Sequence, residues 1–154
     1  MTGENTTDGQ IDASLGHVHL KVRDLDRAVG FYTDVLDLAV TERIARFAFL
    51  SFGDHHHDIA LQEVPPDAPG PSTGVGLYHA AFEVPDEDAL RTVHERLQAR
   101  DIPVSPVDHG ISRALYFDDP AGNGLEVYRD TRAERDRETW GGENRPFDPL
   151  GESP

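Results

Sequence analysis

The sequence contains no cysteine and a single lysine, Lys21, among its 154 residues. Without cysteine there is no disulfide and no thiolate ligand, so any metal ion must be held by histidine and carboxylate side chains. No apolar run approaches the roughly 20 residues that a membrane span needs. The first residues show neither the basic start nor the apolar stretch of a signal peptide. We therefore expect a soluble, cytoplasmic protein with one domain.

Basic residues are also few: the chain has 14 of them and 29 acidic residues, which gives a formal net charge of −15. Such a charge repels nucleic acids and anionic membranes, so neither is expected as a partner. The acidic residues are scattered over tails, helices and loops. This distribution favours adaptation to high salt, as in a halophile, over an acidic catalytic surface.

Hydrophobic periodicity divides the chain into two similar halves on either side of a proline-rich segment. Alternating polar and apolar residues indicate strands, and apolar residues at helical spacing indicate one helix in each half. Both halves follow the order strand, helix and three strands, with expected elements at 17–22, 24–36, 39–45, 46–52 and 57–63, and at 77–84, 85–99, 102–107, 112–118 and 124–130.

The two halves form an internal repeat, which is best seen at two histidines. His17 precedes Val22 by five positions, and His79 precedes Val84 by five. Each half exposes a sheet edge and a sheet face, so the economical arrangement pairs the halves and curls both sheets around a cleft. We predict an α+β fold of two tandem βαβββ modules whose curved sheets enclose a metal-binding cleft.

The chain is expected to divide into an arm, one domain and a tail. The arm is polar and flexible, and the tail is charged and partly ordered. The predicted boundaries are 1–13 for the arm, 14–130 for the domain and 131–154 for the tail, with module one at 14–64, a linker at 65–75 and module two at 76–130.

Three residues are candidate ligands for one divalent metal ion. The repeat gives His17 an equivalent in His79, and a pseudo-twofold axis between the modules would bring the two imidazoles together. Glu126 lies in the last apolar strand, where an unpaired buried carboxylate is costly and a cation would offset the cost. Two histidines and one carboxylate form the facial triad of non-heme Fe(II) oxygenases. The same ligands can hold Mn(II), Co(II), Ni(II) or Zn(II).

Several motifs carry a resemblance to a known family. The repeat, with His17-Val18-His19-Leu20-Lys21-Val22-Arg23-Asp24 and Phe31-Tyr32, resembles the vicinal oxygen chelate superfamily over residues 14–130. That superfamily includes glyoxalases, fosfomycin- and bleomycin-resistance proteins and extradiol dioxygenases. Finer motifs resemble catechol 2,3-dioxygenases, namely Gly76-Leu77-Tyr78-His79-Ala80, His56-His57-Asp58-Ile59-Ala60, Asp108-His109-Gly110-Ile111-Ser112, Ala114-Leu115-Tyr116-Phe117 and Asp119-Pro120.

The resemblance implies roles for the three candidate ligands and for three further residues. It makes the ligands iron ligands, His57 the acid–base histidine, Tyr116 a tyrosine near the bound substrate, and His109 a substrate-side histidine. These roles fit the chemistry of catechol cleavage. His57, with an ordinary pKa of roughly 6.5, can take a proton from the diol and return it later. Tyr116 and His109 can hydrogen-bond to the bound oxygen species or to the substrate.

The same residues also have plain structural interpretations. The run His55-His56-His57 can be a solvated turn or pack beside the core, Tyr116 can be ordinary strand packing, and His109-Gly110 can be a turn. His94, in the middle of the second helix, is expected at the surface, and Trp140 is expected to anchor the tail.

The predicted function is an extradiol-type dioxygenase, with Fe(II) favoured, that cleaves a catechol or a related vicinal diol with O2. A glyoxalase-type lyase or isomerase would need another carboxylate where the chain has Ile59-Ala60-Leu61. A thiol-transferring resistance enzyme would leave His57 and His109 unexplained, and a non-catalytic ligand-binding module is the alternative from another class. Catechol dioxygenases of this type often carry four modules, so a second subunit can supply part of the pocket. Free sheet edges favour a homodimer.

Overall fold

Both expected βαβββ modules are present in the computed structural model, which describes residues 9–151. The first module consists of β1 (Val18–Val22), α1 (Leu25–Leu36), β2 (Ala39–Ile44), β3 (Phe47–Ser51) and β4 (Ile59–Glu63). The second consists of β5 (Ala80–Glu83), α2 (Glu87–Ala99), β6 (Ser105–Asp108), β7 (Ser112–Asp118) and β8 (Gly124–Asp130). The predicted α+β class is confirmed.

The repeat is also visible in how each module begins. His17 and His79 each stand one residue before the first strand of their module. Asp24 and Asp86 cap the two helices, since their side chains accept hydrogen bonds from the backbone amides of Arg27 and Ala89. The same sequence spacing therefore produces the same local structure twice.

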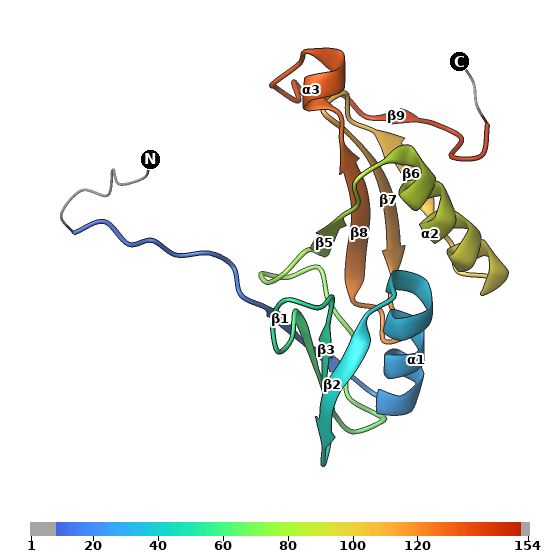
Figure 1. Cartoon of the computed structure of the whole chain (residues 1–154). Helices are drawn as coiled ribbons and strands as arrows, with labels where there is room; N and C mark the ends of the chain where they lie inside the picture. The colour runs from blue at the N-terminus through green and yellow to red at the C-terminus, as the bar shows by residue number, and fades with distance from the viewer. Residues whose placement is uncertain (1–8, 152–154) are drawn as a thin grey trace.

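Each module forms its own sheet. The strand orders are β1-β4-β3-β2 and β5-β8-β7-β6-β9, where β9 is Arg145–Pro146, and the first strand of each module pairs in parallel with the last. Figure 1 shows the first module below the second, with α1 and α2 on the same side of the sheets. In the part of the chain that the structure describes, the two sheets do not close around a common cleft, which differs from the expected arrangement.

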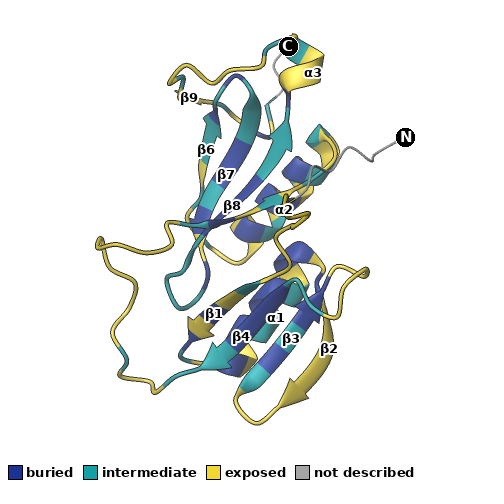
Figure 2. Cartoon of the chain, turned by 90° about the vertical axis from the view of Figure 1, so that its left-hand side faces the viewer, coloured by how far each residue is buried: buried dark blue, intermediate teal, exposed yellow. Residues whose placement is uncertain are grey.

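The helices, rather than the sheet edges, join the two modules. One hydrophobic core contains buried residues of both modules, and the buried positions of Figure 2 lie on the central strands and on the inner sides of the helices. Phe31 on α1 faces Phe117 on β7, with ring centroids 6.2 Å apart. The edge strands β1 and β5 consequently remain free of one another.

Three further features complete the fold. The linker 65–75 contains no helix or strand, whereas the range expected as a tail contains α3 (Arg132–Arg135) and β9. His94 is only 5% exposed, so its expected surface position was wrong: α2 turns this residue towards the core. No helix within residues 9–151 is long and apolar enough to cross a membrane.

Candidate functional site

Two of the predicted metal ligands meet in the second module. The Nε2 atom of His79 lies 3.0 Å from Oε1 of Glu126. The parallel pairing of β5 with β8 explains this approach, because it places Ala81 beside Glu126. Glu126 is only 8% exposed. Two donor atoms that face each other in this way can share one metal ion.

Gly124 allows the backbone to pass close to His79. A Cβ atom at this position would lie 2.6 Å from the carbonyl oxygen of Tyr78, a distance that real Cβ atoms do not show. The close packing of these two backbone segments holds His79 beside the start of β8. Glycine is therefore required here by space and not by an unusual φ angle.

Tyr116 and His109 extend the site from Glu126. Tyr116 on β7 pairs directly with Glu126 on β8, so the two side chains share one face of the sheet. His109 Nε2 lies 2.7 Å from the Tyr116 hydroxyl oxygen. Burial, followed by the charge of Glu126 and the close approach of its carboxylate to the hydroxyl, raises the pKa of Tyr116 well above its usual value. Tyr116 is consequently a neutral hydrogen-bond donor at ordinary pH.

A buried carboxylate holds the loop that carries His109. Asp108 accepts hydrogen bonds from the Gly110 amide, from Arg113 and from Arg135. Burial alone would raise the pKa of Asp108, but the hydrogen bonds from Arg135, from the Gly110 amide and from Arg113 lower it far below its usual range. Thr131 adds a hydrogen bond to the Gly110 carbonyl oxygen, 2.8 Å away.

The first module contains a separate group of histidines. The rings of His17 and His57 lie 4.4 Å apart, and His57 also contacts Phe49 at 4.9 Å between centroids. His56 Nδ1 lies 2.9 Å from His57 Nδ1, and its Nε2 lies 3.1 Å from Glu42. Partial burial, together with His17 and His56, lowers the pKa of His57. Within the histidine run, His57 is half-buried while His55 and His56 are exposed.

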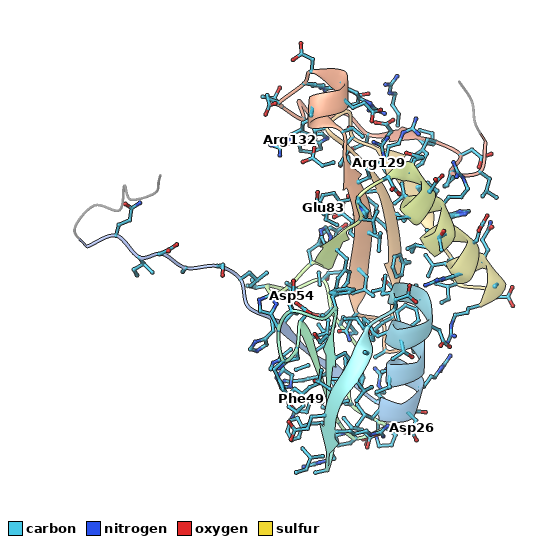
Figure 3. All side chains as sticks on the ribbon, in the orientation of Figure 1. Asp26, Phe49, Asp54, Glu83, Arg129 and Arg132 are labelled. Atoms are coloured by element: carbon cyan, nitrogen blue, oxygen red, sulfur yellow. The ribbon has the colours of Figure 1, made fainter. Side chains whose placement is uncertain are left out.

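The two groups are not brought together within one chain. Among residues 9–151, no three His, Asp or Glu side chains gather as the ligands of one metal ion would. In Figure 3, Phe49 beside the His17 group and Glu83 at the end of β5 lie on different halves of the molecule. The expected meeting of His17 with His79 inside one chain is therefore not observed, because helix packing keeps β1 and β5 apart.

A cavity of about 700 Å³ opens beside His79 and Tyr116 in the second module. His79 and Tyr116 line it together with Phe31, while Arg27 and Arg100 contribute positive charge. This volume is within the range of small-molecule sites.

The sequence interpretation missed one part of the site. Asn144 Oδ1 lies 2.7 Å from Nδ1 of His109, and the ring of Trp140 lies 6.1 Å from the His109 ring. Trp140 therefore does more than anchor the tail. Nothing in the charged segment around Asn144 indicates this contact, since it depends on the pairing of β9 with β6.

Comparison with known proteins identifies the family. A model of the Glyoxalase/Bleomycin resistance protein/Dioxygenase superfamily matches residues 14–127. The chain belongs to this superfamily, as the resemblance of its motifs implied.

Two relatives and one solved structure illustrate the similarity in sequence, length and fold. A catechol-2,3-dioxygenase of Bacillus subtilis is 36% identical over 84% of this chain, which spans 44% of that protein. A biphenyl-2,3-diol 1,2-dioxygenase of Rhodococcus globerulus is 34% identical over 90% of this chain and 76% of its own length. A glyoxylase/bleomycin resistance protein/dioxygenase domain from Frankia has a TM-score of 0.64 at 28% identity, over 77% of this chain and 92% of that one.

The superfamily contains enzymes of more than one kind. Other matches bear the names of a manganese-dependent dihydroxybiphenyl dioxygenase, a FosA glutathione transferase and a lactoylglutathione lyase. Since the chain covers less than half of the Bacillus subtilis relative, the similarity establishes the superfamily, and the reaction must be inferred from the site.

Proposed function

We propose that this protein is a divalent-metal-dependent dioxygenase of the extradiol type that cleaves a catechol or a related vicinal diol with O2. Fe(II) is the favoured metal. The observation that carries the proposal is the buried Glu126 carboxylate, 3.0 Å from His79, beside the linked pair of Tyr116 and His109. Glu126 and Tyr116 share one face of the second sheet, and His79 and His109 contact them from the segments beside the strands.

The surroundings of Glu126 fit a cation. No arginine or lysine pairs with this carboxylate among residues 9–151, and His79 and Tyr116 are the side chains in contact with it. A buried carboxylate without a positive partner is costly, and a divalent ion would offset that cost. When bound, such an ion brings the diol and O2 together as a Lewis acid. His79 and Glu126 would hold it, with His17 as the third ligand.

A second copy of the chain can supply His17. His17 leads into β1 and His79 leads into β5, and both strands are free sheet edges. Pairing β1 of one copy with the partner's β5 would bring His17 beside the partner's His79, and twofold symmetry would create two such sites. The exposed apolar residues near these edges support this homodimer, because a second copy would cover them: Ile11, Leu15, Val75, Leu77 and Tyr78.

In this proposal, proton transfer and hydrogen bonding come from residues on two sides of the substrate. His57 accompanies His17, since their rings are in contact, and it would accept a proton from the diol and return it later. Tyr116 and His109 accompany Glu126 and would donate or accept hydrogen bonds at the substrate oxygens. Glu126 itself is only 8% exposed, so little of its surface is open to solvent.

The other enzyme types of the superfamily have less support here. A glyoxalase-type site needs a carboxylate on β4, but Ile59, Ala60 and Leu61 are all at most 1% exposed and belong to the core. In a thiol transferase, neither His57 nor His109 would have a role in the reaction. Dioxygenase chemistry uses both.

Oxygen uptake tests the proposed reaction. The protein is loaded with Fe(II) without oxygen in high-salt buffer, catechol or 3-methylcatechol is added, and air is admitted. We expect oxygen consumption and a yellow ring-cleavage product, both abolished by Glu126→Gln. A panel of catechols that gives neither oxygen uptake nor colour would overturn the dioxygenase assignment.

A mixing experiment tests the shared site. His17→Ala and His79→Ala should each be inactive and bind metal weakly. If the site spans two copies, co-refolding equal amounts should restore about a quarter of the wild-type activity, because half of the dimers are mixed and each has one intact site. Mixed His79→Ala and Glu126→Gln subunits should remain inactive, since both substitutions then fall in the same half-site. Equal rescue in both mixtures, or none in either, would contradict the shared site.

A further inference from the structure

We propose that Asn144 is a positioning residue that fixes the tautomer of His109 and thereby directs the hydroxyl hydrogen of Tyr116 away from Glu126. This inference rests on the proposed function only in that it makes Tyr116 and His109 part of the reaction site. The hydrogen-bond chain itself can be tested without activity.

The first step concerns the Nδ1 atom of His109. It lies 2.7 Å from Asn144 Oδ1 and 3.3 Å from the backbone carbonyl oxygen of Glu143. Both oxygens accept a hydrogen bond from Nδ1–H, and the contact with Asn144 is much the shorter, so Asn144 makes the deciding interaction and the Glu143 carbonyl only adds to it. The Asn144 amide then presents its oxygen to the same hydrogen. Both partners favour the neutral Nδ1–H tautomer.

The second step follows from the other ring nitrogen. In the Nδ1–H tautomer, Nε2 is an acceptor, and it lies 2.7 Å from the Tyr116 hydroxyl oxygen. Tyr116 must therefore donate its only hydroxyl hydrogen to His109. Tyr116 is also within hydrogen-bonding reach of Glu126. Because the hydrogen is committed to His109, both oxygens of Glu126 stay available to His79 and to a cation.

The opposite tautomer would reverse this arrangement. With its hydrogen on Nε2, His109 would donate to Tyr116, and the Tyr116 hydrogen would turn to Glu126. That hydrogen bond would compete with a metal ion for the carboxylate. Asn144, which stands immediately before β9 and far from Glu126 in the sequence, would thus influence a metal ligand through two intervening side chains.

The segment that carries Asn144 is held firmly against His109. The Trp140 indole donates from Nε1 to the Glu143 carbonyl oxygen at 2.6 Å, and Arg137 donates to the Trp140 carbonyl oxygen at 2.8 Å. The next residues form β9, which pairs with β6 immediately before His109 and follows the edge of the second sheet (Figure 1). Asn144 is therefore placed by its backbone and not by a mobile tail.

Gly110 leaves the room that this segment needs. Its φ angle is +82°, and a Cβ atom there would lie 2.1 Å from Nη1 of Arg137. Both the conformation and the close approach require glycine. The loop after His109 and the segment before Asn144 consequently fit together as one wall of the site.

Nitrogen-15 spectra of histidine provide the direct test. The full-length chain, labelled at its histidines and free of metal, is measured at pH 8, and the His109 signals are assigned as those missing from His109→Gln. We expect the Nδ1–H pattern for the wild type and for Asn144→Asp, which keeps the acceptor oxygen. Asn144→Ala should move His109 towards the Nε2–H form. Thr139→Ala, in the same segment, should leave the spectrum unchanged.

The outcomes separate the tautomer from the reaction. An Nε2–H pattern in the wild type, or an unchanged His109 pattern in Asn144→Ala, would overturn the inference even if the protein is a dioxygenase. The expected spectral change without oxygen uptake would overturn the proposed function alone. In an active enzyme, Asn144→Ala should lower kcat about tenfold, as removal of outer hydrogen-bond partners commonly does, and Asn144→Asp should recover most of the loss.

Discussion

Tyr32 on α1 donates its hydroxyl hydrogen to Oδ2 of Asp119, 2.8 Å away, and both residues are buried. Asp119 belongs to the loop that leads into β8 and also accepts hydrogen bonds from the amides of Ala121 and Asn123. One carboxylate thus shapes the loop before Glu126 and links it to the helix of the other module. This contact explains how the first module supports the site in the second.

Removal of the hydroxyl should weaken this link. Tyr32→Phe keeps the ring in the core but leaves Asp119 with one donor fewer, so we expect it to lower the free energy of unfolding by about 1–2 kcal/mol. Urea unfolding in high-salt buffer measures the difference. Tyr128→Phe is the matched control, because its hydroxyl donates to Glu83 over a long 3.4 Å. Equal stability of Tyr32→Phe and the control would contradict the proposed link.

Gly124 should prove essential for metal binding. In Gly124→Ala the new methyl group would meet the Tyr78 carbonyl oxygen at 2.6 Å, so the backbone that carries His79 must move. We expect weaker binding of Mn(II) or Fe(II), about tenfold or more, measured by calorimetry on the purified protein. Gly30→Ala is the control, since a Cβ at this helical position meets nothing within 4 Å and alanine stabilises helices. Unchanged affinity in Gly124→Ala would show that His79 tolerates the shift.

The order of helices and strands within each module could be predicted from the sequence, but the packing of one module against the other could not. Alternation around His17 and His79 and the capping residues Asp24 and Asp86 are local features, so the repeat could be recognised without a structure. The relation between modules depends on which helix faces meet, and Phe31 and Tyr32 read equally well as core residues within one module. The two sheets therefore do not close around the expected cleft within one chain, and the choice of His17, His79 and Glu126 as ligands stays a prediction.

In the candidate site, too, some contacts could be predicted from the sequence and others depend on long-range packing. The closeness of Tyr116 to Glu126 follows from the β7–β8 register, which the short turn between the two strands makes predictable. The contact of Asn144 with His109 depends on β9, a two-residue strand without a sequence pattern. The burial of His94 likewise depends on how α2 is turned. Long-range packing determines both features, and local periodicity carries no trace of it.

The buried His94 should make stability depend on pH. Burial lowers the pKa of His94 below its ordinary value of 6.5, although Asp148 and Glu95 act in the opposite direction. The unfolded chain therefore binds a proton more readily, and the wild type loses stability as the pH falls below about 6.5 and towards the lower folded-state pKa. In His94→Leu this contribution is absent, so its stability relative to the wild type should increase between pH 7 and pH 5.

Thermal unfolding across this pH range measures the effect. Thr92→Ala lies on the exposed side of the same helix and removes no titratable group, so its pH dependence should match that of the wild type. Parallel curves for His94→Leu and the wild type would mean that His94 is protonated equally in the folded and unfolded chains.

Loss of the Asp108 charge should destabilise the protein more than loss of a carboxylate charge at the surface. Asp108→Asn keeps one acceptor oxygen but removes the charge that faces Arg113 and Arg135, so we expect a loss of about 2–3 kcal/mol in the free energy of unfolding at pH 7. The sign of the pH dependence follows from the lowered pKa of Asp108. The stabilisation is complete above the ordinary pKa of 3.8 and is lost as the pH falls further, so acid should narrow the gap between wild type and variant. Asp34→Asn, whose partner Arg100 lies at the surface, should change stability little at any pH. A similar loss in both variants, or a gap that widens in acid, would disprove the special role of the Asp108 carboxylate.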